Sequence, residues 1–243
     1  MQRAGPDVSG RIGVAILARA PVPGQVKTRL IPTLGAQGAA RLQRWLLHRT
    51  VATALAADTG PVALWCAGDA SHPDIDLCRA HGPITVKPQP EGDLGARMLA
   101  AVCQSPTLAG TLVIGTDCPA LSAAQLRHAA DSLRDHDAVA FPAEDGGYVL
   151  IGMKAPAREL FVGVDWGTYR VMSQTRQHLF TLGWRWTEPA NLWDVDRPED
   201  VDRLTTMFPE VGEALKDAQG SVDDVSHLRD EPRIAGTPTK EDR

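Results

Sequence analysis

The stretch Leu112-Val-Ile-Gly-Thr-Asp-Cys-Pro-Ala-Leu-Ser122 decides the fold, because an apolar run typical of a buried strand ends there in a single carboxylate. The branched residues lie between two glycines, as in parallel strands that are covered on both faces. Pro119 ends the run, and Ser122 with Gln125 has the spacing of a helix capping box. The predicted order is therefore strand, acidic turn and helix.

Asp117 is the residue in this stretch that needs an explanation. In an open parallel sheet, ligands bind beyond the carboxyl ends of the strands, and Asp117 would be presented at that edge. The alternative is that its carboxylate only closes an Asx turn. The local sequence leaves both open, and other segments have to decide between a ligand site and a turn.

Composition narrows the class of protein. With 243 residues, 43% of them hydrophobic, we expect one substantial α/β domain. The net charge of −5 argues against a general affinity for nucleic acid. The four cysteines lack C-x-x-C spacing, which predicts neither a zinc site nor a disulfide framework and fits a reducing cytoplasm. No export signal or run of about 18 apolar residues is present, so we expect a cytoplasmic protein without a membrane span.

Strand and helix patterns alternate along the chain, which predicts a mostly parallel sheet. Apolar runs predict strands at 12–18, 62–66, 84–87, 112–114, 138–142, 148–152 and 184–188, with 138–142 and 148–152 forming a pair. Helical spacing predicts helices at 36–57, about 74–80, from Asp93 onward, 122–134, and after Thr168 as N-cap. We expect the domain to span 11–208, after a flexible N-terminus at 1–10 and before a polar, loosely attached tail at 209–243.

The loop after the first strand is a candidate phosphate cradle. It runs from Ala18-Arg19 through Gly24 to Lys27-Thr28-Arg29 and places two cations and a hydroxyl close together. Backbone amides near glycine can approach phosphate oxygens, lysine supplies a point charge and arginine binds in a bidentate manner. The spacing differs from a Walker A loop. A loop of solvated surface cations is the alternative interpretation.

Three further segments carry candidate site residues. Asp93 is a predicted N-cap, and Gly92 with Gly95 would allow close approach of a ligand, although glycine near a cap needs no ligand. Asp145-Gly146 could be a hairpin turn or a second acidic turn at the site.

The last of these segments contains Asp194 and Asp196. Asp196 with Glu199 has the pattern of an N-cap, so that role competes with a role in the site. Asp194 has no comparable structural explanation.

Together these motifs resemble the radical-SAM/selenodomain-associated transferase 1 family, a glycosyltransferase-like group. The residues that carry the resemblance are Pro21-Val-Pro-Gly-Gln-Val-Lys-Thr-Arg-Leu30, Gly92-Asp-Leu-Gly95, Gly115-Thr-Asp-Cys-Pro119, Asp145-Gly-Gly-Tyr148, Trp166-Gly-Thr168 and Asp194-Val-Asp196. The family is similar to GT-A nucleotide-diphospho-sugar transferases and to cofactor guanylyltransferases. The resemblance implies a Rossmann-like three-layer sandwich with a nucleotide across the carboxyl ends of the strands and a divalent metal. The Asp-x-Asp motif of GT-A enzymes is reduced here to Thr116-Asp117-Cys118.

Residues and resemblance combine into one hypothesis about the site. Lys27 and Arg29 would hold phosphates, and Asp117 with Asp194 or Asp196 would bind Mg²⁺ or Mn²⁺. The other expected nucleotide-binding positions are Ala18, Arg19, Gly24, Thr28, Gly92, Asp93, Gly95 and Thr116. The expected catalytic residues are Lys27, Arg29, Asp117 and Asp145, and the positions expected to face the acceptor are Asp145, Gly146, Gly147, Tyr148, Trp166 and Thr168.

Three functions remain open at the level of sequence. A nucleotidyltransferase would pass a nucleotidyl group from an NTP to a small acceptor and release pyrophosphate, which the basic loop favours slightly. A glycosyltransferase would use an NDP-sugar donor, which the resemblance favours. A nucleotide-binding module without turnover is the third, although extra carboxylates would weaken polyphosphate binding unless a metal is present.

Overall fold

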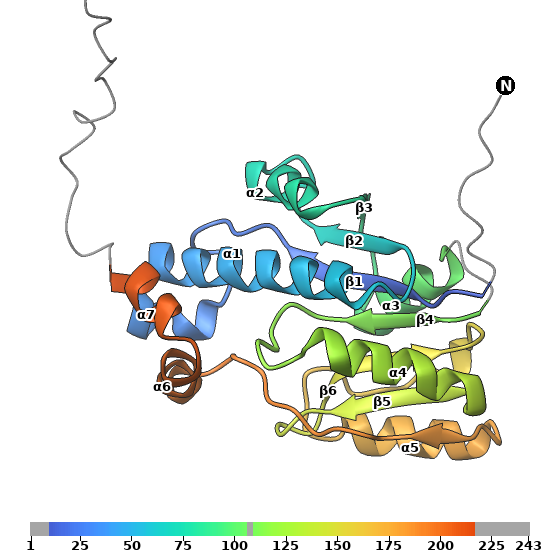
Figure 1. Ribbon diagram of the computed structural model, residues 1–243. Coiled ribbons are helices and arrows are strands. Elements are labelled where there is room, and N and C mark those ends of the chain that lie inside the picture. Colours follow the sequence, from blue (N-terminus) through green and yellow to red (C-terminus); the bar gives the residue numbers. More distant parts are fainter. Residues whose placement is uncertain (1–9, 106–108, 217–243) are drawn as a thin grey trace, which may run out of the picture.

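A single seven-stranded sheet organises the chain, in the order β3-β2-β1-β4-β6-β5-β7. The computed structural model describes residues 10–105 and 109–216 (Figure 1). Its strands are β1 Gly13–Arg19, β2 Val62–Ala67, β3 Ile84–Pro88, β4 Thr111–Ile114, β5 Ala138–Pro142, β6 Tyr148–Met153 and β7 Trp186–Thr187. Strands β1 to β4 are parallel, and β6 runs antiparallel to both of its neighbours. The prediction of a mixed α/β fold with a mostly parallel sheet is confirmed.

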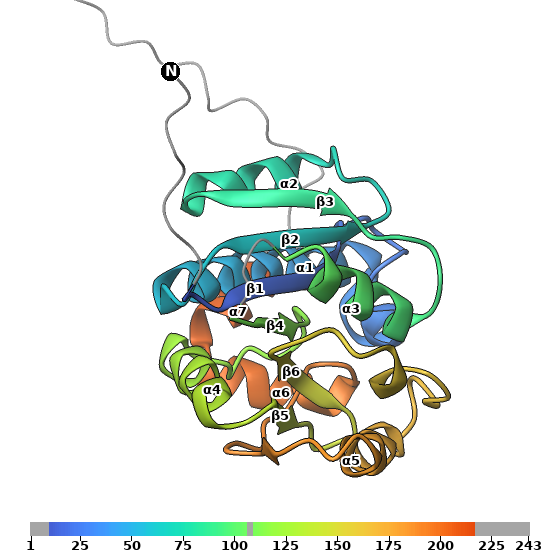
Figure 2. The ribbon, with the colours of Figure 1, turned by 90° about the vertical axis from the view of Figure 1, so that its right-hand side faces the viewer.

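Helices cover both faces of the sheet, which gives three layers (Figure 2). The α-helices are α1 Ile31–Ala57, α2 Pro73–Leu77, α3 Leu94–Cys103, α4 Ala123–Asp135, α5 Val171–Thr181, α6 Pro198–Met207 and α7 Pro209–Lys216. The described part of the chain also contains the short 3₁₀ helices η1 Thr28–Leu30, η2 Cys78–His81 and η3 Arg158–Leu160. Among the described helices, none is long and apolar enough to cross a membrane.

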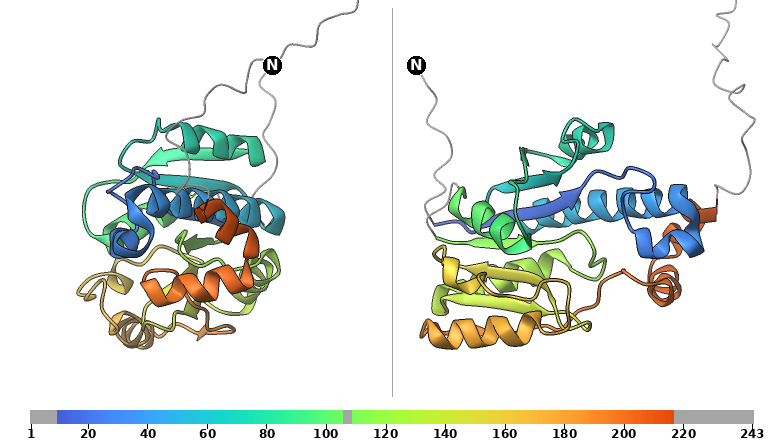
Figure 3. Two further views of the ribbon diagram at one scale, coloured as in Figure 1. Left: turned by 90° about the vertical axis from the view of Figure 1, so that its left-hand side faces the viewer. Right: turned by 180° about the vertical axis from the view of Figure 1, so that it is seen from behind.

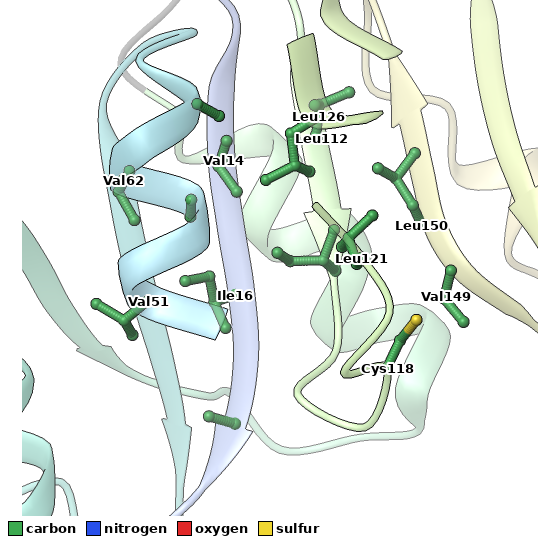
Figure 4. Packing of buried hydrophobic residues seen from close by; sticks show 14 of the residues in the cluster. Val14, Ile16, Val51, Val62, Leu112, Cys118, Leu121, Leu126, Val149 and Leu150 are labelled. Carbon is green, nitrogen blue, oxygen red and sulfur yellow. The ribbon is translucent and has the colours of Figure 1, made fainter. Parts of the chain in front are cut away.

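Alternation along the strands divides the core between the two faces. Val14 and Ile16 of β1 pack with α1 and α4, whereas Ala15 between them packs with α3 and α5. Figure 4 shows part of the first cluster, with side chains from β1, β4 and α4. Period-two burial is what a strand covered on both faces requires, because successive side chains point to opposite sides. Packing against helices therefore covers both faces of the central strands. A ligand can bind at the ends of these strands.

Local capping follows the sequence closely in the middle of the chain. The Ser122 side chain and Gln125 form the predicted capping box at the start of α4, and Asp93 accepts from the Ala96 amide at the start of α3. The predicted helix at 36–57 is the continuous part of α1. The helix begins earlier, at Ile31, but it is interrupted at Gly35, whose φ of 67° lies in the left-handed region.

The predicted cap of α5 is wrong, and the cap considered for Asp196 is not formed. Helix α5 begins at Val171 after Arg170, so Thr168 is not its N-cap. The Thr168 hydroxyl donates to the Asp165 carbonyl at 2.8 Å and accepts from the Arg170 amide at 3.3 Å. At α6, Asp200 accepts from the amides of Asp196 and Arg197, so the capping carboxylate is one residue beyond Glu199. This leaves the Asp196 side chain free of a capping role.

The C-terminal boundaries also differ from the prediction. Strand β7 has two residues where five were expected, because it pairs only briefly with β5. Helix α7 occupies the first part of the expected tail, and its Val211 is 1% exposed against α1 and α6. Helices α6 and α7 lie beside the start of α1 at one end of the molecule (Figure 3). The expected N-terminal segment up to residue 9 and the tail from 217 lie outside the described residues.

Candidate active site

A cleft of about 670 Å³ lies across the carboxyl ends of β1, β4 and the β5–β6 hairpin. Its walls carry four basic side chains, from Arg19, Lys27, Arg29 and Arg97, and four acidic ones, from Asp117, Asp145, Asp194 and Asp196. The predicted cradle, the acidic turn after β4 and the segment before α6 therefore meet in one place. Charges of both signs at one cleft are the arrangement expected for a polyanionic ligand together with a cation.

The loop after β1 is held by two buried side chains, Val26 at 3% and Leu30 at 0% exposure. Between them, Lys27 adopts a left-handed conformation with φ 47° and ψ 42°. This backbone region is unfavourable for residues other than glycine, and such strain is common at functional sites. The side chain of Lys27 is 4% exposed, and its Nζ donates to the Val195 carbonyl at 2.5 Å and lies 2.7 Å from Asp117 Oδ1. The loop thus places one buried cation against the acidic turn.

Asp117 is oriented by a network that reaches into α1. The Thr116 hydroxyl donates to Asp117 Oδ1 at 3.3 Å, and that hydroxyl accepts from Gln43 Nε2 at 3.2 Å. Gln43 is 4% exposed. Among the described residues, no backbone amide donates to the Asp117 carboxylate, whose side chain is 49% exposed. A carboxylate held by a lysine and a hydroxyl, with half its surface open to the cleft, fits a ligand site better than an Asx turn.

The segment 191–196 crosses the end of the sheet and joins the two halves of the cleft. Leu192 pairs with Ala143 as an isolated parallel bridge, and the Val195 amide donates to the Asp117 carbonyl at 2.8 Å. Asp196 then forms an ion pair with Arg29. The second predicted cradle cation is therefore neutralised by a carboxylate, as Lys27 is by Asp117.

Asp194 lines the cleft together with three other carboxylates. Burial and the nearby charges of Asp145, Asp117 and Asp196 raise the pKa of Asp194 from 3.8 to about 6. Repulsion of this kind disfavours the ionised form until a cation compensates it. Asp145 lies in the turn of the β5–β6 hairpin, which was one of its two predicted roles, and its Oδ1 accepts from the Gly147 amide at 2.9 Å.

This donor set fits a hard divalent cation in part. Within the described ranges, no group of three or more His, Cys, Asp or Glu side chains is arranged to hold a metal. Mg²⁺, however, commonly takes one or two carboxylates and completes its shell with substrate phosphate and water. Asp117 and Asp194 offer carboxylate oxygens at the cleft, where burial and then the nearby charges of Asp145 and Asp117 raise the pKa of Asp194. Asp117 and Asp196 are each paired with a cation, Lys27 and Arg29, whereas Asp194 forms no ion pair within the described residues.

Part of the cleft lining is aromatic. Tyr148 and Trp166 meet edge to face with ring centroids 6.5 Å apart, and the Tyr148 hydroxyl donates to Met98 Sδ at 3.7 Å. Burial raises the pKa of Tyr148, which keeps its phenol neutral. Thr168, exposed, lines the same region. A neutral aromatic wall suits contact with an acceptor or a sugar more than proton transfer.

Cys118 lines the cleft but is a poor nucleophile. It is 8% exposed, and burial raises the pKa of its thiol to about 12. Since the thiolate is the reactive form, the side chain is inert at neutral pH. This agrees with a site that works by binding and charge compensation.

Several predicted site residues lie outside the lining of the cleft, namely Gly24, Gly92, Asp93, Gly95 and Gly146. Their local roles are visible. Gly24 turns the loop with φ 79°, and Asp93 caps α3. A Cβ on Gly95 would lie 2.8 Å from the Trp166 ring, and one on Gly146 would lie 2.2 Å from the Tyr169 carbonyl oxygen. These two glycines permit close packing of the segments that form the walls.

The cleft also contains residues that the sequence did not single out as site residues. They are chiefly Gln43 from α1, Gln89 after β3, and Arg97 with Met98 from α3. Gln43 and Met98 follow the apolar spacing of helices that pack on the sheet, which hides them among core positions. For Arg97 a signal was available. Its place one turn after a predicted N-cap puts it near the start of a helix that begins at the cleft.

Comparison with known proteins places this geometry in context. Residues 50–168 match the family described as "Uncharacterized protein conserved in bacteria (DUF2064)". No curated protein matches the chain.

A crystal structure from Desulfovibrio desulfuricans G20, assigned to the nucleotide-diphospho-sugar transferases, is similar over 84% of this chain and 96% of its own, with 25% identity and a TM-score of 0.74. A nucleotidyl transferase from Methanothermobacter matches 83% of this chain and 99% of its own at 14% identity, with a TM-score of 0.55. The CTP complex of CMP:2-keto-3-deoxy-manno-octonic acid synthetase matches 82% and 99% at 8% identity, with a TM-score of 0.52. The fold is therefore that of nucleotide-diphospho-sugar transferases and nucleotidyltransferases.

Proposed function

We propose that this protein is a metal-assisted transferase that uses a nucleotide substrate. The observation that carries the proposal is the single cleft at the carboxyl ends of the strands, where four basic and four acidic side chains meet. Nucleotide di- and triphosphates carry several negative charges, and both transfer at phosphorus and transfer at an anomeric carbon require that charge to be compensated as the leaving group departs. The similarity in fold to transferases supports the same conclusion.

Asp117 and Asp194 are the residues that would hold a divalent cation, with Mg²⁺ or Mn²⁺ as the candidates. Such a cation would supply charge compensation for the phosphate oxygens of the nucleotide. Lys27, which is buried beside Asp117, fixes the direction of that carboxylate through their ion pair. Arg29 is more exposed, at 66% of its side chain, and can exchange Asp196 for a phosphate group.

Nucleotidyl transfer from an NTP is the reaction we favour. An oxygen of the acceptor attacks the α-phosphorus, the bond from that phosphorus to the bridging oxygen breaks, and pyrophosphate leaves with the electron pair. Two cations of the loop after β1 and a metal would suit a leaving pyrophosphate. Tyr148, Trp166 and Thr168 would face the acceptor, a small phosphorylated or hydroxylated molecule.

Glycosyl transfer from an NDP-sugar is the second candidate. The relevant observation is the similarity to the Desulfovibrio protein, which at 25% identity is assigned to the nucleotide-diphospho-sugar transferases. In that reaction the apolar wall of Tyr148 and Trp166 would contact the sugar, and the NDP would leave. The two reactions differ in whether a third phosphate has partners in the cleft.

A thermal-shift panel tests the proposal. The full chain is heated with each NTP, NDP and NDP-sugar, with Mg²⁺ and with EDTA. A ligand present at 100 times its Kd stabilises the fold by roughly 2.7 kcal/mol, which is roughly 5–10 °C for a chain of this size. We expect a shift for at least one nucleotide, and a larger shift with Mg²⁺.

The order of ligands separates the two reactions. A nucleotidyltransferase should be stabilised most by an NTP, and a glycosyltransferase by an NDP-sugar at least as much as by any NTP. If no nucleotide shifts the melting temperature under either condition, the proposed function is wrong.

A further inference from the structure

Two of the four basic side chains that line the cleft form no ion pair with a carboxylate in the described residues. Lys27 pairs with Asp117 and Arg29 pairs with Asp196. Across residues 10–105 and 109–216, neither Arg19 nor Arg97 forms an ion pair. The uncompensated positive charge of the cleft is therefore carried by Arg19 and Arg97.

The side-chain amide of Gln89 links Arg97 to the end of β1. Gln89 donates from Nε2 to the carbonyls of Ala18 and Trp65, each at 2.9 Å, which fixes its side chain across the ends of β1 and β2. Its Oε1 then accepts from Arg97 Nη1 at 3.5 Å. The guanidinium is thus one amide away from the residue that precedes Arg19.

The guanidinium of Arg97 is poorly satisfied. Its Nε is buried and has no hydrogen-bond partner in the described part of the chain, and its contact with Gln89 is long. An unsatisfied buried donor is costly, and more so when it belongs to a charged group. Arg97 lies half-buried one turn into α3, where a structural arginine would be expected to reach a carboxylate or solvent. Its position in the wall of the cleft indicates a partner that arrives with the ligand.

We infer that Arg97 and Arg19 form an oxyanion-binding subsite at the β1–β2 side of the cleft, separate from the Lys27–Asp117 and Arg29–Asp196 pairs. Its ligand chemistry is a phosphate or carboxylate group, which a guanidinium binds through charge-assisted hydrogen bonds. The source of that group is either the phosphate tail of the nucleotide or an anionic group on the acceptor. The choice between these two sources rests on the proposed function. The prediction that the subsite binds an oxyanion rests only on the two arginines that form no ion pair in the described residues.

Calorimetric titration with inorganic pyrophosphate in EDTA tests the subsite directly. The full chain and the Arg97→Gln and Arg19→Gln variants are compared with Arg158→Gln, a matched control in which an exposed arginine outside the cleft loses the same charge. We expect pyrophosphate affinity to fall on the order of 10- to 100-fold for Arg97→Gln, and by a smaller factor for the more exposed Arg19→Gln. The control should bind as the unaltered protein does.

Two results would overturn the inference: pyrophosphate that does not bind the unaltered protein, and equal affinity of Arg97→Gln and Arg158→Gln. A second titration, with the best nucleotide of the thermal-shift panel already saturating, identifies the source of the oxyanion. If pyrophosphate no longer binds, the subsite holds the nucleotide tail; if it still binds in an Arg97-dependent manner, the subsite holds the acceptor. If no nucleotide binds but pyrophosphate does so through Arg97, the proposed function fails and the subsite stands.

Discussion

The raised pKa of Asp194 makes the stability of the folded protein depend on pH. Its pKa of about 6 lies above the ordinary carboxyl value, because burial and the charges of Asp145, Asp117 and Asp196 disfavour ionisation. The folded state therefore binds a proton at this residue more tightly than the unfolded state does. Stability from this group is present below pH 4 and is lost as the pH rises from about 4 through about 6.

Asp194→Asn should remove that loss. In EDTA at pH 7 we expect the variant to melt a few degrees above the unaltered protein, since roughly 1 kcal/mol corresponds to about 2–4 °C at this size. The difference should shrink as the pH falls toward 4. Melting curves across this pH range, with Asp165→Asn as a control carboxylate outside the cleft, check the account. A variant that is less stable at pH 7 would show that Asp194 is needed for folding.

Single residues were predictable where the sequence ends a strand on an unusual side chain. Asp117 follows a buried branched run and does line the cleft. Asp196 was ambiguous between a cap and a site residue, because its partner Arg29 lies 167 positions away in the sequence. No local pattern reports such a pair. The same holds for Arg97, whose lack of a carboxylate partner becomes visible after all the surrounding elements are in place.

At the scale of elements, α1 does more than pack. Most of its buried positions are apolar, but Gln43 reaches the Thr116 hydroxyl and, more weakly, the Arg19 carbonyl at 3.4 Å. Helical spacing predicts Gln43 only as part of a buried face. Six residues further along the helix, Arg49 donates to the Pro119 carbonyl at 2.9 Å, and its guanidinium lies 4.3 Å from the Phe208 ring centroid. The helix thus holds the acidic turn from one side.

Gln43→Met should separate positioning from packing. Methionine keeps the length and apolar contacts of the side chain but not its donation to Thr116, so Asp117 loses part of its orientation. We expect a small change in melting temperature and a Mg²⁺ enhancement of nucleotide binding that is several-fold weaker.

Thr50→Val on the same helix is the control, because the buried Thr50 hydroxyl only donates to the Leu46 carbonyl within α1. If Mg²⁺ enhances nucleotide binding to the Gln43→Met protein as much as to the unaltered protein, Gln43 has only a structural role.

For the whole molecule, the alternation of strands and helices was sufficient to predict the layers, since each strand that is buried on both faces needs helices on both sides. Less predictable was the path of residues 191–196, which return across the end of the sheet to bring Asp194 beside Asp117. That return depends on backbone bonds from Val195 and Leu192 to distant segments, at 2.8 and 3.0 Å, and backbone groups carry no sequence signature. The cleft is completed by this crossing.

A calorimetric titration of the full chain determines whether the cleft binds a nucleotide together with a divalent cation held by Asp117. The best nucleotide of the thermal-shift panel is titrated into the unaltered protein and into Asp117→Asn, each with Mg²⁺ and with EDTA. Asparagine keeps the size of the side chain but removes its charge. We expect Mg²⁺ to tighten binding on the order of 10-fold or more in the unaltered protein and to have no effect on Asp117→Asn. A folded Asp117→Asn protein whose nucleotide affinity still rises with Mg²⁺ as much as that of the unaltered chain would contradict the account.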